Sequence, residues 1–228
     1  MYRLGIDTGG TFTDAVLLDD QGNIRVFKSS TTPDDFSLGV INCLRDAATE
    51  LRSELPEFLS KVTVIAHGST VATNAVLTSS GAKVGSISTK GFRDTLELRR
   101  RKRPGEWFRK VKPVEPLCPR YLSLEVDERV RYTGEIITPL NERDVLSAIK
   151  TFKEEGVEAI AVCLLFSVLN PVHEIRVKEI IEQEYPEAFV SISSDVLPQL
   201  REYERTSTVV LDAYVSPTVV DYVTKLEK

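Results

Sequence analysis

Three short runs of alternating apolar and polar residues open the chain. They read YRLGID, FTDAVLLD and NIRVFKS, and turns at Gly9-Gly10 and at residues 20–23 join them. This pattern predicts an antiparallel meander of three strands. From Phe36 to about Leu55 apolar residues recur at helical spacing, which predicts a helix with one buried face.

Strands and helices then alternate. The run VTVIAHG predicts a strand that ends at Gly68. A helix is predicted from Ser69 to about Ser80, closed by Gly81, and the run KVGSIST predicts another strand. After an irregular insertion near 90–140, the pattern predicts in turn a helix over 141–155, a buried strand VEAIAVCLLF, a helix HEIRVKEIIEQE and a strand AFVSISS. A meander followed by βαβ units is an α/β arrangement. We expect an RNase-H or actin-like domain, with a mixed sheet flanked by helices.

Composition adds limits to this picture. The 228 residues are 42% hydrophobic and 28% charged, with a net charge of −5, which favours neither nucleic acid nor membranes as partners. Three distant cysteines without CxxC spacing indicate reduced thiols: Cys43, Cys118 and Cys163. No signal-peptide pattern and no apolar run of roughly 18 residues is visible. We therefore expect a cytoplasmic protein that binds no nucleic acid and no membrane.

One segment departs from the acidic average. Between Arg99 and Lys112 there are eight basic residues against the single Glu106. Such a run is most often a solvated loop, but it could also dock an acidic partner subunit or guide an anionic substrate. Trp107 and Phe108 lie among the basic residues, so nucleic-acid binding is a further interpretation, which the acidic remainder disfavours.

The stretch DTGGTFTD, Asp7 to Asp14, carries the main candidate chemistry. A dinucleotide loop would lead from a strand into a helix, whereas these glycines lead into the strand-like TFTDAVLL. A Walker A loop needs Gly-Lys-Ser/Thr, and no lysine precedes Lys28. An aspartic protease needs a second Asp-Thr-Gly, which the chain lacks.

The remaining interpretation is a phosphate-binding hairpin. Glycines permit positive φ and leave no Cβ in the way, so the N–H groups of the turn could converge on phosphoryl oxygens while hydroxyls donate around them. Asp7 and Asp14 could hold Mg²⁺ through its waters. The candidate phosphate-binding residues are Thr8, Gly9, Gly10, Thr11 and Thr13. The alternative is a tight hairpin with solvated aspartates and threonines.

Candidates for the substrate side follow the predicted fourth strand. His67 ends that strand, and a helix start at Gly68, Ser69 and Thr70 could attract an anion through free N–H groups and the helix dipole. Asn74 lies one helical turn beyond Thr70. An ordinary helix cap with a hydrogen-bonded His67 is an equally good interpretation.

Two later pairs are weaker candidates. His173 and Glu174 alone cannot form a zinc site, which needs three or four ligands, so a structural role is favoured. Glu204 and Arg205 precede a helix whose polar side could reach a cleft, although charges at a helix start are usually solvated or capping.

Several of these motifs, in order along the chain, resemble the N-terminal half of the hydantoinase A and 5-oxoprolinase family, which includes acetone carboxylase subunits. They are GIDTGGTFTDAVLLD, AHGSTVATNAVLTSSGAKVG, TKGFRDTLELRR, VDERV, GVEAIAVCLLFS with NPVHEIRV, and SSDVLPQLREYERTSTVVLDAYVSP. The resemblance implies the actin, sugar-kinase and Hsp70-like ATPase fold, with ATP and Mg²⁺ in a cleft between two domains. Residues 1–200 would be the N-terminal domain, and 201–228 a helix leading to a second domain outside this chain.

The resemblance also implies a reaction. ATP would phosphorylate the carbonyl of a cyclic amide such as a hydantoin or 5-oxoproline, with Asp7, Asp14 and His67 as catalytic residues and a second subunit type as partner. A ketone carboxylase subunit, a sugar or acid kinase, and a regulatory or assembly ATPase remain alternatives. Ser69 stands where the family more often has threonine, and serine keeps the hydroxyl group. We expect this fragment to bind Mg-ATP weakly and turn nothing over by itself.

Overall fold

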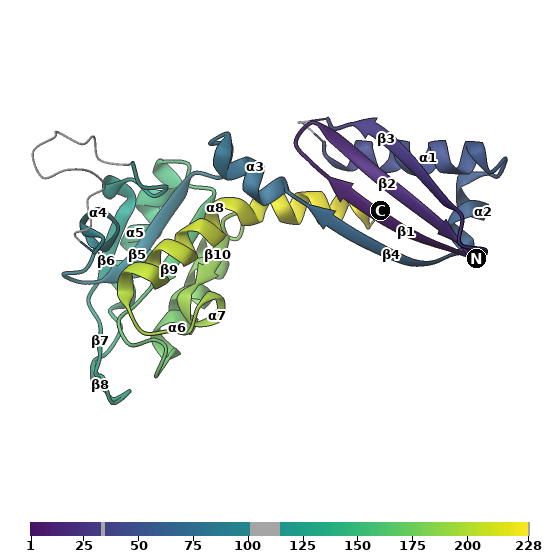
Figure 1. Ribbon diagram of the computed structural model, residues 1–228. Coiled ribbons are helices and arrows are strands. Elements are labelled where there is room, and N and C mark those ends of the chain that lie inside the picture. Colours follow the sequence, from purple (N-terminus) through teal and green to yellow (C-terminus); the bar gives the residue numbers. More distant parts are fainter. Residues whose placement is uncertain (33–34, 101–114, 228) are drawn as a thin grey trace, which may run out of the picture. The chain divides into compact units, whose positions relative to one another are not determined.

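The computed structural model describes residues 1–32, 35–100 and 115–227, and these form two compact units (Figure 1). Unit 1 contains Met1–Ser80 and Thr218–Lys228, and unit 2 contains Gly81–Pro217. Each unit has its own sheet and its own hydrophobic core. The predicted α/β class, with a meander, βαβ units and sheets flanked by helices, is confirmed.

Unit 1 is built on a mixed four-stranded sheet in the order β3-β2-β1-β4. The first three strands form the predicted antiparallel meander, and β4 pairs with β1 in parallel. The strands are β1 Tyr2–Thr8, β2 Phe12–Asp19, β3 Ile24–Ser30 and β4 Val62–Ser69. Because side chains alternate across a strand, Leu4, Ile6 and Thr8 of β1 are buried on one face.

Helices cover that buried face of the unit 1 sheet, and Figure 1 shows α1 (Ser37–Glu50) lying along it. Val40, Leu44 and other apolar residues of α1 join Leu4 and Ile6 in one core. The helix α2 (Leu55–Ser60) was not predicted, and it adds Phe58, which is fully buried. The short helix α3 (Val71–Leu77) follows β4.

Unit 2 contains an all-parallel sheet in the order β10-β9-β5-β6. Every residue of β5 (Val84–Thr89) and β9 (Ala159–Cys163) is buried, as expected for central strands covered on both faces. Two helices lie on the face towards which Ile160 points, α5 (Glu142–Glu154) and α6 (Val172–Glu184). The opposite face receives α8 (Glu202–Leu226), where Asp212 accepts a hydrogen bond from Ser191 of β10 (Phe189–Ile192) at 2.6 Å.

The segment near 90–140, predicted as an irregular insertion, contains several short elements among its described residues. The strand β6 (Ser123–Val126) is an integral edge of the unit 2 sheet, parallel to β5. Four residues are too few to show a strand period in sequence. The other short elements there are α4 Thr95–Leu98, the 3₁₀ turn η1 Arg120–Leu122, β7 Arg129–Val130 and β8 Ile136–Thr138, and a further short helix, α7 Ser193–Val196, follows β10.

The predicted C-terminal helix is present as α8, which continues through Pro217. Proline has no N–H to donate and its ring crowds the preceding turn. In that turn the carbonyl of Tyr214 accepts a hydrogen bond from the N–H of Ala82 at 2.9 Å. The two compact units divide after Ser80 and after Pro217. A domain boundary near residue 200 stays a prediction. Among the described residues, no helix combines the length and low polarity needed to cross a bilayer.

Gly85 gives a test of how tightly unit 2 is packed. A Cβ on Gly85 would lie 2.5 Å from Cε1 of Phe152, a fully buried side chain of α5. Gly85→Ala is therefore expected to destabilise the protein by about 1–3 kcal/mol, the usual range for overpacking. Urea denaturation followed by circular dichroism measures the change.

Gly5→Ala is the matched control for this substitution. Gly5 is also in a strand, but a Cβ added there would have no atom of the described residues within 4 Å beyond its chain neighbours. We expect a change within about 1 kcal/mol. Equal losses at both glycines would contradict the packing argument.

Candidate functional site

The hairpin between β1 and β2 brings the two candidate carboxylates together. Asp7 and Asp14 are direct partners in the antiparallel register, followed by Thr8 and Thr13. Both aspartates lie on the face of the sheet opposite the buried Ile6 and Thr8. They line a hollow of about 420 Å³ together with Gly5, Ile6, Val16, Ala66, His67 and Gly68. The hollow is an open, acidic depression on unit 1.

The two glycines of the turn are required for space. Neither Gly9 nor Gly10 has a positive φ, so the conformational explanation expected from sequence does not apply. A Cβ on Gly10 would instead lie 2.9 Å from Nδ2 of Asn74, in α3. A Cβ on Gly9 would lie 3.1 Å from the carbonyl oxygen of Phe12. The turn is thus pressed between its own second strand and α3.

The turn leaves few N–H groups for a ligand. The N–H of Gly9 closes the hairpin by donating to the Phe12 carbonyl at 2.9 Å. Within residues 1–32, 35–100 and 115–227, no acceptor is found for the N–H groups of Gly10 and Thr11. Both residues are exposed. These two N–H groups and the Thr11 hydroxyl are what the turn can offer to an anion.

The hydroxyls of Thr8 and Thr13 point to the covered face. Thr13 Oγ1 lies 3.2 Å from Thr31 Oγ1, and Thr31 Oγ1 donates to the Gly9 carbonyl at 3.0 Å. A Cβ on Gly39 of α1 would lie 2.5 Å from Thr13 Oγ1, so helix and hairpin are in close contact. Both threonines are fully buried. Their hydroxyls support the hairpin from behind.

Lys28 is a site residue that the sequence reasoning missed. Its Nζ lies 2.8 Å from Oδ1 of Asp14 and 4.8 Å from the ring centroid of Phe12. Lys28 is the cross-strand partner of Asp14 in β3. The turn at residues 20–23 carries the register signal that could have revealed this pair.

The two aspartates are the candidate ligands for Mg²⁺. Asp7 and Asp14 present carboxylate oxygens side by side, and Mg²⁺ is commonly bound by one or two carboxylates while it keeps several waters. No group of three or more His, Cys, Asp or Glu residues that could hold a metal occurs in the part of the chain described. The residues therefore fit a hydrated Mg²⁺ held mainly by waters and phosphate, and they do not form a closed metal cage.

The predicted helix start after His67 is arranged differently. Strand β4 continues to Ser69, and α3 begins at Val71. Ser69 Oγ accepts from the Val71 N–H at 3.1 Å, while the N–H and hydroxyl of Thr70 both donate to the Thr8 carbonyl. Asn74 Nδ2 donates to Thr70 Oγ1 at 3.1 Å. Thr70 thus ties the start of α3 to the end of β1, and the place of Ser69, Thr70 and Asn74 on the substrate side stays a prediction.

His67 and Gly68 lie on opposite faces of the sheet. Gly68 pairs with Asp7, and its Cβ position would be 3.7 Å from Asp7 Oδ1. His67 pairs with the buried Ile6, so its imidazole points to the covered face, where Nε2 lies 2.6 Å from the hydroxyl of Tyr222 in α8. Partial burial lowers the pKa of His67, and the Asp7 carboxylate opposes this shift. His67 is itself exposed and lines the hollow, while its imidazole bonds on the Tyr222 side of the sheet.

The weaker candidates lie in a buried polar cluster at the carboxyl edge of the unit 2 sheet. His173 Nδ1 is 2.8 Å from Oε2 of Glu128, and both side chains are buried. Glu174 accepts from the N–H groups of Leu164 and Ser194, each at 2.8 Å, and it is fully buried. Arg205 donates to the Leu164 carbonyl. Hydrogen bonding within the cluster favours the structural interpretation of His173, Glu174 and Arg205.

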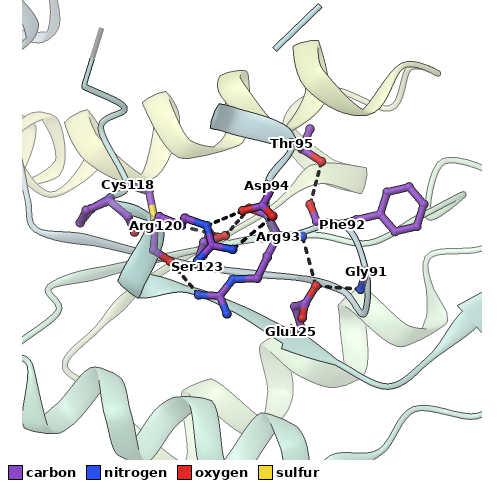
Figure 2. Close-up of polar contacts among 11 residues, drawn as sticks. Gly91, Phe92, Arg93, Asp94, Thr95, Cys118, Arg120, Ser123 and Glu125 are labelled. Carbon is purple, nitrogen blue, oxygen red and sulfur yellow. Dashed lines mark hydrogen bonds and ion pairs between the residues drawn. The ribbon is translucent and has the colours of Figure 1, made fainter. Parts of the chain in front are cut away.

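The segment GFRD before the basic run is fixed by hydrogen bonds (Figure 2). Glu125 accepts from the N–H groups of Gly91 and Arg93, and Arg120 makes two bonds to the Asp94 carboxylate, the shorter at 2.6 Å. Arg93 donates to the Arg120 carbonyl at 2.9 Å. Glu204 forms an ion pair with Arg100. The rest of the basic run, residues 101–112, lies outside the described residues.

Two solved structures share the fold. An ATP-dependent caprolactamase from Pseudomonas jessenii gives a TM-score of 0.89 with 38% identity over 99% of this chain and 33% of its own. A nucleotide-free acetone carboxylase gives a TM-score of 0.85 with 28% identity over 100% of this chain and 34% of its own. The chain therefore has the α/β fold of the actin-like ATPase class.

The family follows from the sequence match. Residues 3–185 match the family described as hydantoinase/oxoprolinase N-terminal region, and the chain belongs to that family. The caprolactamase subunit alpha of Pseudomonas jessenii is 39% identical over 99% of this chain. The acetophenone carboxylase gamma subunit of Aromatoleum aromaticum is 38% identical over 93%. The chain spans about a third of the length of these relatives, 33% and 31%.

The contact between Gly10 and Asn74 can be tested by a double-mutant cycle. Gly10→Ala places a Cβ against the Asn74 amide, and we expect a loss of about 1 kcal/mol or more in unfolding free energy. Asn74→Ala removes the obstacle together with the bond to Thr70. The double variant should therefore be more stable than the sum of the two losses implies, with a coupling of about 0.5–3 kcal/mol.

Urea denaturation of the four proteins measures this coupling. Simple additivity within about 0.5 kcal/mol would contradict the close contact between turn and helix.

Proposed function

We propose that this chain is the N-terminal part of an ATP-dependent hydrolase of cyclic amides, such as a lactam, hydantoin or 5-oxoproline. The observation that carries the proposal is the juxtaposed pair of Asp7 and Asp14 beside a turn with two N–H groups open to a ligand. Membership of the hydantoinase/oxoprolinase family and the caprolactamase relative support the substrate class. Caprolactam, the substrate named for that relative, is a cyclic amide.

The reaction needs little covalent chemistry from the protein. The amide carbonyl oxygen attacks the γ-phosphorus of ATP, the bond from this phosphorus to the bridging oxygen breaks, and ADP leaves. Water then adds to the activated carbon, the ring C–N bond breaks, and a second water releases phosphate from the acyl phosphate. Phosphoryl transfer of this kind is catalysed mainly by positioning and charge neutralisation.

The residues of unit 1 divide these tasks. Asp7 and Asp14 would hold Mg²⁺ through its waters, and the ion would supply positive charge at the phosphates. The N–H groups of Gly10 and Thr11 and the Thr11 hydroxyl bind phosphoryl oxygens, while Thr8, Gly9 and Thr13 shape the turn. Lys28 fixes Asp14. Gly68 leaves room beside Asp7, and His67 serves the acceptor side.

A ketone carboxylase subunit is the second candidate. The relative from Aromatoleum aromaticum is named as an acetophenone carboxylase subunit, and its identity of 38% is close to the 39% of the caprolactamase subunit. In that case ATP would phosphorylate an enolate or bicarbonate oxygen. Both relatives are named as subunits, so a second kind of subunit belongs to the proposal. Three free, buried cysteines agree with a reducing cytoplasm.

The proposal predicts substrate-dependent release of phosphate from Mg-ATP by the complete natural protein with its second subunit. Caprolactam, 5-oxoproline, hydantoin, and acetophenone or acetone with bicarbonate are offered in turn. One cyclic amide should stimulate phosphate release. Asp7→Asn should reduce the stimulated rate by about 10- to 100-fold, the usual cost of losing a group that orients a metal through its ligands. Chain 1–228 alone should bind Mg-ATP weakly and show no turnover.

Asp20→Asn is the matched control, because it removes the same charge at the far end of the unit 1 sheet, where Asp20 is exposed and pairs with the amino terminus. It should leave the rate unchanged. Stimulation by a ketone with bicarbonate would instead establish the carboxylase. A slow rate of phosphate release that no acceptor changes would favour a regulatory ATPase. Phosphorylation of a sugar or an acid would favour a kinase.

A further inference from the structure

Side chains of Thr8, His67 and Ser69 lie around the phenol of Tyr222 in unit 1. The hydroxyl of Tyr222 in α8 donates to Oγ1 of Thr8 at the end of β1, at 2.9 Å. The same hydroxyl lies 2.6 Å from Nε2 of His67 in β4. Tyr222 is 4% exposed and Thr8 is fully buried, while Phe36 packs edge-on against the Tyr222 ring with centroids 6.2 Å apart. The phenol is therefore held in place from several sides.

The number of protons fixes the direction of these bonds. A phenol has one proton, and here it goes to Thr8. The short contact with His67 must then be a bond that Nε2–H donates to the phenol oxygen. A neutral imidazole has only one N–H, so Nδ1 is left with its lone pair. Burial lowers the pKa of His67 and raises the pKa of Tyr222, which agrees with two neutral groups.

The lone pair of Nδ1 has no partner of its own. Among the residues that the structure describes, none donates a hydrogen bond to His67 Nδ1. A histidine whose tautomer is fixed through one nitrogen can use the other as a base, since the second group orients the imidazole.

We propose that Tyr222 is a positioning residue that fixes His67 as the Nε2–H tautomer, so that Nδ1 accepts a proton from water in the amide-opening step. The catalytic part of this inference rests on the proposed function. As the water oxygen bonds to the activated carbon, its proton passes to Nδ1. The same proton is returned to the ring nitrogen of the substrate when the C–N bond breaks, so the histidine ends as it began.

The tautomer is measured by nitrogen NMR of the chain labelled with ¹⁵N-histidine. The chain has only two histidines, His67 and His173, so two imidazoles appear. We expect Nε2 of His67 to be protonated and Nδ1 to be unprotonated. Tyr222→Phe should remove this preference and shift both nitrogen signals of His67. His173, which pairs with Glu128 in unit 2, should not change and reports that the chain is folded.

A second variant gives a result of opposite sign. Thr8→Val removes the acceptor of the phenol proton and keeps the shape of the side chain. The Tyr222 hydroxyl should then donate to Nε2 of His67, and the proton of the imidazole should move to Nδ1. A merely structural role of Tyr222 predicts no such reversal. Protonated Nδ1 in the unaltered chain, or unchanged His67 signals in both variants, would overturn the assignment.

The catalytic part is tested separately in the complete protein. Tyr222→Phe should lower kcat for amide-dependent phosphate release by about tenfold or more, because general acid–base catalysis contributes about 10²–10⁴-fold, while KM for ATP stays the same. An unchanged kcat with the expected NMR result would overturn the catalytic role of Tyr222. A complete protein without any amide-dependent release refutes the proposed function, whereas the tautomer is decided by NMR alone.

Discussion

Strand β1 is the constraint on which the candidate site depends. It pairs with β2 on one side and with β4 on the other, so β1 defines the register of both neighbouring strands. Because successive side chains point to opposite faces, Asp7 belongs to the open face and Thr8 to the covered one. A shift of one residue would exchange them. Two neighbouring residues thus belong to the two separate parts of the proposed chemistry.

The two units handle buried polarity in different ways. In unit 2 the carboxyl edge of the parallel sheet, where α/β proteins often bind ligands, is filled by buried polar side chains. His173 bonds to Glu128, while Glu174 and Arg205 bond to the backbone of Leu164. In unit 1 the corresponding ends of β1 and β4 keep Asp7 and the turn open. Among the described residues, the acidic hollow with the two candidate carboxylates therefore lies in unit 1.

Much of the fold could be predicted because the hydrophobic periods are long and clear. The meander, the buried strand β9 and the helices α1, α5, α6 and α8 all follow the predicted pattern. β6 was missed because it is four residues long, and α2 because its six residues follow α1 closely. The pairing of Asp7 with Asp14 was predictable from the hairpin. The phenol of Tyr222 was not, since no local pattern shows that a residue 155 positions beyond His67 contacts it.

The approach of α1 to the hairpin has an evolutionary consequence. At Gly39 the helix lies so close to Thr13 that even a methyl group would collide with the hydroxyl. The position of the turn is therefore coupled to a helix residue that faces no ligand. If the turn binds a nucleotide as proposed, selection for that affinity should also constrain Gly39, and variation at this codon would be purged for its effect on a site that it never touches.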